Sequence, residues 1–192
     1  MLLFSLRFIV LASIWQLHLT AQLIPHMGYF IEIHQMDCES NQSYINNFVC
    51  KVSVPRNRSL DASLRIVQKL NVLTGSLKVS IPNSKKVFTK IFDLTFDLCK
   101  TLRERKRKAL LDLLVKSLNR GSNAIIRCPF GNGNYFSKNI TAGDSLPPLL
   151  TETDFLVHFD VFIPKLAHVA NVTVLGRLFD ISKEQARKKK FL

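Results

Sequence analysis

Glycine and proline are scarce in this sequence, with seven of each among 192 residues. That scarcity excludes a collagen-like repeat and a Pro/Gly-rich disordered chain, and no internal repeat or low-complexity segment interrupts the sequence. Hydrophobic residues make up 47% of it. A chain of this length can bury most of its surface in one core. The sequence therefore predicts a single folded domain over residues 22–182.

Catalytic motifs are also missing. Asp93 and Asp97 would lie on one face of a strand about 13 Å apart, which is too far for the carboxylate pair of a retaining glycosidase. Three histidines lack the nucleophile-elbow and zinc-protease contexts that would give them a catalytic role: His34, His158 and His168. The sequence predicts a protein that is not an enzyme and needs no cofactor, and a lipid or glycan hydrolase is the least favoured of three hypotheses.

Acidic residues are few, with 14 Asp and Glu against 27 Lys and Arg, and the formal net charge is +13. Two basic runs, 103–108 and 187–190, contribute to this excess, and the second lies in a basic C-terminal tail over 183–192. Such runs bind nucleic acid in many intracellular proteins. In a secreted protein, they predict instead a solvated surface or a site for anionic lipid headgroups or sulfated glycans. We therefore expect no nucleic-acid partner.

The N-terminus explains why secretion is expected. Residues 1–21 contain one cation, Arg7, and no acid. Arg7 is followed by an apolar stretch from Phe8 to Trp15. This is the pattern of a signal peptide, with cleavage expected after Ala21. A membrane anchor is disfavoured because polar residues interrupt the run well short of the ~20 apolar residues that spanning requires.

Cysteines and glycosylation sequons agree with an extracellular location. The four cysteines are Cys38, Cys50, Cys99 and Cys128. An even number predicts two disulfides with three pairings open, and no spacing fits a zinc site, so no metal is expected. Asn-x-Ser/Thr sequons begin at Asn41, Asn57, Asn139 and Asn171, which predicts a glycoprotein.

Most of the remaining sequence alternates apolar and polar residues with a period of two, as half-buried strands do. The clearest segments are 64–72, 88–98, 155–163 and 170–178, with weaker ones at 28–36, 48–54, 77–81, 124–128 and 135–140. Leucines at helical spacing before Gly121 predict one helix over about 100–120. We therefore expect a mainly β protein, an immunoglobulin-like β-sandwich of about eight or nine strands with one inserted helix.

Phenylalanine is abundant, with 14 Phe against 3 Tyr and 1 Trp. On strand 88–98, alternation predicts that Phe88, Phe92 and Phe96 share a face, and Phe155 and Phe159 share a face of strand 155–163. These rings either fill a solid core or line an apolar cavity between two sheets. The sequence does not choose between the two.

Several short motifs carry a family resemblance: Asp97-Leu-Cys99, Ser122-Asn123, Cys128-Pro129-Phe130 and the proline-containing segment 139–150. Together they resemble a large insect family of small secreted proteins, expanded in fruit flies, that includes putative pheromone-perception proteins. That family is similar to the lipid-recognition (ML) superfamily, whose β-sandwiches hold a lipid between two sheets. One departure is at 151–155, where the family usually has Pro-x-Gly-x-Tyr and this chain has Thr-Glu-Thr-Asp-Phe.

The resemblance implies disulfides Cys38–Cys50 and Cys99–Cys128. It also implies a secreted carrier of a lipid, fatty acid or hydrocarbon, with a role in chemosensation. The residues expected to line its ligand site are Phe92, Phe96, Phe155 and Phe159. The alternative is an extracellular interaction module that binds a receptor, an anionic membrane or an acidic glycan through the basic helix and tail.

Overall fold

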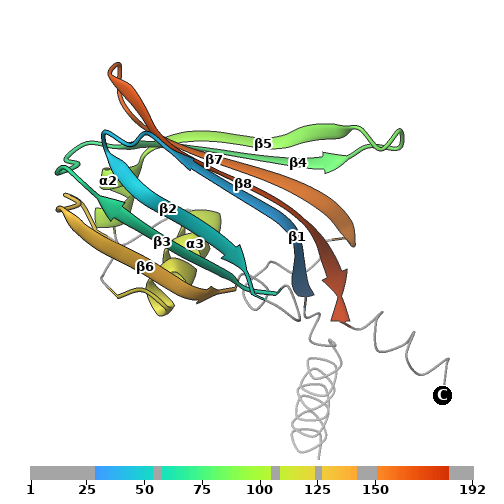
Figure 1. The fold of residues 1–192 in the computed structure, drawn as a ribbon. Coiled ribbons are helices and arrows are strands. Elements are labelled where there is room, and N and C mark those ends of the chain that lie inside the picture. The colour runs from blue at the N-terminus through green and yellow to red at the C-terminus, as the bar shows by residue number, and fades with distance from the viewer. Residues whose placement is uncertain (1–28, 54–57, 105–108, 124–126, 142–150, 182–192) are drawn as a thin grey trace, which may run out of the picture.

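Two antiparallel sheets form the protein, as the computed structural model describes it for residues 29–53, 58–104, 109–123, 127–141 and 151–181 (Figure 1). Five strands form the larger sheet in the order β1-β8-β7-β4-β5, and three form the smaller in the order β2-β3-β6. The strands are β1 Tyr29–Ser40, β2 Ile45–Val52, β3 Leu60–Ile66, β4 Thr74–Pro82, β5 Phe88–Asp97, β6 Gly133–Ile140, β7 Thr153–Ile163 and β8 Ala167–Asp180. The predicted mainly β sandwich is confirmed.

The larger sheet extends beyond the smaller one. In Figure 1 the small sheet lies opposite one end of the large sheet, and the turn between β4 and β5 reaches well past it. A buried cluster fills the end where both sheets are present, and its fully or nearly buried members are Ile45, Ile66, Leu70, Leu73, Cys99, Val169 and Ala170. The filled core is therefore confined to one part of the space between the sheets.

Two disulfides hold this end together. Cys38 in β1 bonds Cys50 in β2, which joins the large sheet to the small one. Cys99 bonds Cys128 across a sequence separation of 29 residues. This is the pairing that the family resemblance implies, and bonds of this kind persist in oxidising compartments.

The predicted strand over 64–72 is too long. β3 ends at Ile66, and Leu70 is a buried residue whose backbone pairs in an isolated bridge with Phe130. Val72 is 54% exposed. Leu70 and Val72 therefore do not share a buried face, although the sequence alternates apolar and polar residues through both positions. The reason is that Leu70 takes its hydrogen bonds from the Phe130 backbone and not from a neighbouring strand.

The prediction of one continuous helix over 100–120 is wrong. Two helices are present, α2 Leu98–Arg103 and α3 Ala109–Arg120. Asp97 begins α2 by accepting a hydrogen bond from the Lys100 N–H at 2.7 Å, and Glu104 ends it in an extended conformation. A continuous helix would have stacked like charges of the run 103–108 at spacings of three and four residues, which is unfavourable.

The segment after α3 closes the outer edge of β6. The Lys138 N–H donates to the Gly121 carbonyl at 3.0 Å, and the Asn123 N–H donates to the Phe136 carbonyl at 3.1 Å. Asn123 Oδ1 accepts in turn from the Phe136 N–H at 2.8 Å. Gly121 lies so close to the Lys138 backbone that a Cβ there would overlap the carbonyl oxygen. Glycine is therefore required by close approach of two backbones.

Replacing Gly121 by Ala should accordingly lower the free energy of unfolding by about 2 kcal/mol or more, because the backbone of β6 or of residue 121 must move. Gly131→Ala is a matched control, since the nearest atom to a Cβ there is 4.0 Å away, and it should change stability by less than about 0.5 kcal/mol. Urea denaturation followed by circular dichroism measures both. Equal stabilities of the two variants would contradict this close approach.

Candidate functional site

An apolar surface covers the face of the large sheet that is turned toward the small sheet. Residues opposite one another on antiparallel strands share a face, so the strand register defines this surface, which we call the inner face. One row across β5, β4, β7, β8 and β1 consists of Leu94, Leu77, Phe159, Val172 and Cys38, and the next of Phe92, Val79, Val157, Val174 and Met36. No position in either row is charged.

All four predicted lining residues lie on the inner face. The Phe96 and Phe159 rings are stacked with centroids 6.4 Å apart and planes at 26°, from strands on either side of β4. Both rings lie over Gly75, where an added Cβ would be 2.9 Å from Phe96 Cζ and 3.2 Å from Phe159 Cε2. Glycine at this position lets the two rings approach each other.

Phe155 covers a second glycine on the neighbouring strand. It pairs in register with Gly176, and a Cβ on Gly176 would lie 2.7 Å from Phe155 Cζ. The ring therefore takes the space that a side chain on β8 would have occupied. Gly75 and Gly176 are the residues of this surface that sequence reasoning missed, although a glycine inside a strand is a recognised sign of close approach.

The prediction that Phe88 shares a face with Phe92 is wrong. The β4–β5 register shifts so that Phe92 pairs with Val79 whereas Lys90 pairs with Ser80, which leaves Ile91 without a partner across the ladder. One extra residue in a strand reverses the faces on which all later side chains lie. Phe88 is consequently on the opposite face from Phe92 and is 38% exposed.

The inner face is not sealed. Leu77 is buried at 3% exposure, but the four phenylalanines, Val79, Val157, Val174 and Met36 are all only partly buried. None of the four phenylalanines belongs to the packed cluster or to the residues packed against it in the described part of the chain. A well-filled sandwich would have buried these central positions. The arrangement instead leaves an apolar surface that faces the sandwich interior and lacks protein contacts over part of its area.

The outer face of the large sheet has the opposite character. Asp160 forms an ion pair with Lys78 at 3.9 Å and lies 3.6 Å from His168 Nε2, and Arg177 pairs with Asp154 at 3.7 Å. A hydrogen bond from Lys90 at 2.6 Å, reinforced by the charges of Lys90 and Lys78, holds the pKa of Asp93 below its usual range. Over the central residues of this sheet, charge thus lies on the solvent side, as the alternating sequence predicts, whereas Asp180 at the end of β8 is buried.

Two surface hollows formed by described residues do not involve the predicted lining side chains. One, of about 450 Å³, lies on the outer face by the β7–β8 turn and includes Lys78, Asp160 and His168. The other, of about 480 Å³, lies by the β1–β2 turn and includes Ser40 and Phe48.

The remaining predicted residues lie at the periphery or outside the described ranges. Asn41 and Asn139 are exposed, and Asn171 lies on the outer face, where its Nδ2 donates to Glu39 at 3.0 Å. Asn57, most of the basic run 103–108, the signal segment 1–21 and the tail 183–192 fall outside the described residues. Glycosylation and the roles of the basic segments stay predictions.

Neither a metal cluster nor a spanning helix is found within the described ranges. No group of three or more His, Cys, Asp or Glu residues there could hold a metal ion. None of the described helices has the length and hydrophobicity needed to cross a membrane.

A comparison with known proteins finds a match to one family model over part of this surface. The model of a family described as "Protein of unknown function (DUF1091)" matches residues 75–157. The match runs from Gly75 to Val157 and contains all of β5 and three of the four predicted lining residues, Phe92, Phe96 and Phe155, whereas Phe159 lies just beyond it. No curated protein matches the chain.

Among solved structures, the chain is similar to the crystal structure of chicken MD-1 complexed with lipid IVa. The two are 12% identical in sequence with a TM-score of 0.39, and the alignment covers 79% of this chain and 97% of MD-1.

The stacked rings over Gly75 can be tested by a double-mutant cycle. Phe96→Ala and Phe159→Ala should show a coupling free energy of about 0.5–1.5 kcal/mol, because each ring loses its partner when the other is removed. Phe96→Ala combined with Phe136→Ala, on the small sheet, should be additive within about 0.5 kcal/mol. Urea denaturation supplies all the values, and additivity of Phe96→Ala with Phe159→Ala would show that the rings do not pack together.

Proposed function

We propose that this protein is a secreted, non-catalytic carrier that holds a lipid, fatty acid or hydrocarbon against the inner face. The observation that carries the proposal is the continuous apolar surface formed by β5, β4, β7 and β8, whose phenylalanines remain partly exposed inside the sandwich. Contact between these apolar side chains and water is unfavourable, so a molecule that covers them lowers the free energy.

An apolar ligand supplies the missing cover. Each Å² of apolar surface removed from water contributes roughly 25 cal/mol before the entropy cost of association. The two central rows hold no charged side chain, so the part of the ligand that lies on them must itself be uncharged and apolar. An alkyl chain satisfies this condition, and a sugar or a nucleotide does not.

The family resemblance narrows the biological setting. The motifs around Cys99, Cys128 and 139–150 resemble insect proteins that include putative pheromone-perception members, and the signal-peptide pattern predicts export. The proposed ligands are therefore lipids, fatty acids or hydrocarbons with a role in chemosensation.

A tryptophan reporter tests the location of the ligand. The chain has one tryptophan, Trp15, inside the segment 1–21, so protein lacking that segment has none. Phe92→Trp places an indole on the inner face, and Phe88→Trp places one on the same strand but on the opposite face. Titration with a brominated fatty acid should quench the first indole in a saturable manner and leave the second almost unchanged, because bromine quenches only on close contact.

Equal quenching of the two indoles, or none in either, would contradict binding at the inner face. The alternative function, an interaction module acting through the basic segments, predicts no quenching of Phe92→Trp and retention on a sulfated glycan column that falls steeply with salt.

A further inference from the structure

The outer face of the small sheet combines exposed apolar and basic side chains. Val49, Ser63 and Phe136 lie opposite one another across β2, β3 and β6. Val49 is 44% exposed and Phe136 is 41% exposed, with the Lys138 ammonium 5.5 Å from the Phe136 ring centroid. Two solvent-exposed apolar side chains, with a serine between them, therefore form a row across the centre of this face.

Cations flank that row on both sides. Arg65 lies two residues from Ser63 along β3, and Lys51 and Lys138 lie two residues from Val49 and Phe136 on the other side, so all are on the same face. All three are exposed, and none forms an ion pair with another described residue. We call Val49, Phe136, Lys51, Arg65 and Lys138 the basic-apolar patch.

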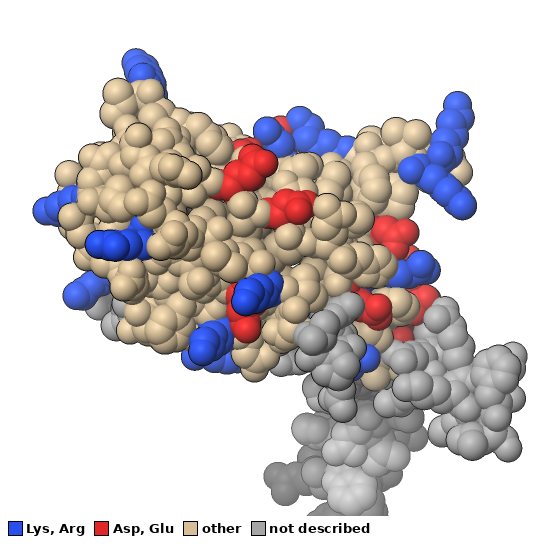
Figure 2. Space-filling view, viewed as in Figure 1, with Lys and Arg blue, Asp and Glu red and all other residues tan. Residues whose placement is uncertain are grey.

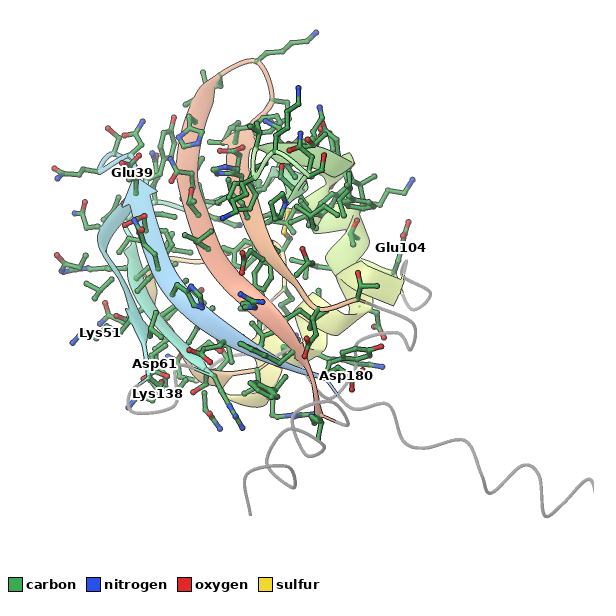
Figure 3. The ribbon with its side chains drawn as sticks, turned by 90° about the vertical axis from the view of Figure 1, so that its right-hand side faces the viewer. Glu39, Lys51, Asp61, Glu104, Lys138 and Asp180 are labelled. Carbon is green, nitrogen blue, oxygen red and sulfur yellow. A yellow bond between two sulfur atoms is a disulfide. The ribbon has the colours of Figure 1, made fainter. Side chains whose placement is uncertain are left out.

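One acid lies within this patch. Asp61 pairs in register with Lys51, and its Oδ1 accepts a hydrogen bond from the Asn139 N–H at 2.8 Å. Figure 3 shows Lys51, Asp61 and Lys138 gathered on the outside of the molecule. A single carboxylate among three cations leaves the patch net positive.

The opposite side of the sandwich differs in both respects. On the outer face of the large sheet Lys78, Lys90 and Arg177 are each matched with a carboxylate, and further acids lie on the same face at Glu32, Asp37 and Glu39. In Figure 2 most acidic residues lie over β1 and β8, whereas the surface over β2, β3 and β6 is mainly uncharged with separate cations. Charge is thus distributed unequally between the two outer faces.

We propose that the basic-apolar patch docks the protein on an anionic lipid membrane. Cations near such a surface gain about 1 kcal/mol each from its negative potential, and an aromatic ring and a valine between them can enter the headgroup region. A sulfated glycan would use the cations but would have no use for Phe136 and Val49. The acid-rich outer face of the large sheet is repelled by the same membrane, which fixes the orientation of the bound protein.

Vesicle flotation of the secreted full-length protein tests this. The probes are phosphatidylcholine vesicles with and without phosphatidylserine. Lys51→Glu combined with Lys138→Glu should weaken binding to the anionic vesicles at least about tenfold. Lys85→Glu combined with Lys165→Glu is the matched control, because it changes the net charge equally at exposed turn positions away from the patch and should weaken binding less than about threefold.

Phe136→Ser separates the membrane from a purely charged partner. It should lower vesicle binding severalfold while leaving retention on a heparin column unchanged, since only a membrane uses the ring. Failure of the unaltered protein to bind anionic vesicles, equal losses in the two double variants, or full vesicle binding by Phe136→Ser would each overturn the proposal. The tryptophan reporter on the inner face is independent of these outcomes, so the carrier function and the docking surface can fail separately.

Discussion

The alignment of apolar positions across four antiparallel strands is the constraint on which the rest of this structure depends. Because β5, β4, β7 and β8 are held in one register over their central residues, every side chain of two successive inner rows is apolar. A shift of any strand by one residue would turn charged groups such as Asp93 or Asp160 into the sandwich. The register therefore separates an apolar interior from a charged exterior.

The small sheet covers this interior incompletely, and that determines where the protein is solid and where it is open. Both disulfides and the buried cluster lie where the two sheets face each other. The aromatic rows extend past that cluster, so a protein with an otherwise ordinary fold keeps a partly exposed apolar surface. The two outer faces also differ in charge, and this difference favours one orientation of the molecule at an anionic surface.

Much of this arrangement could be predicted from the sequence, because strand alternation in β7 and β8 is nearly perfect and places Phe155 and Phe159 correctly. The β5 bulge could not be foreseen, since alternation counts residues and one unpaired residue at Ile91 reverses the face of Phe88. The end of α2 at Glu104 falls within a segment whose leucine pattern indicates one longer helix, and that pattern carries no signal for the break. Gly75 and Gly176 acquire meaning only when the strand beside each brings a phenylalanine ring over it.

The sequence alone also left a filled core and a hollow one equally open, because both require the same aromatic residues. The partial exposure of the inner face favours the hollow core. The central claim is therefore that an apolar ligand binds against the inner face. Native mass spectrometry of protein secreted from insect cells, after enzymatic removal of N-glycans and compared with its denatured mass, tests that claim most directly. Excess mass that disappears on denaturation is predicted and would give the size of the co-purified ligand. A native mass equal to that of the polypeptide with two disulfides would contradict a tightly held apolar ligand.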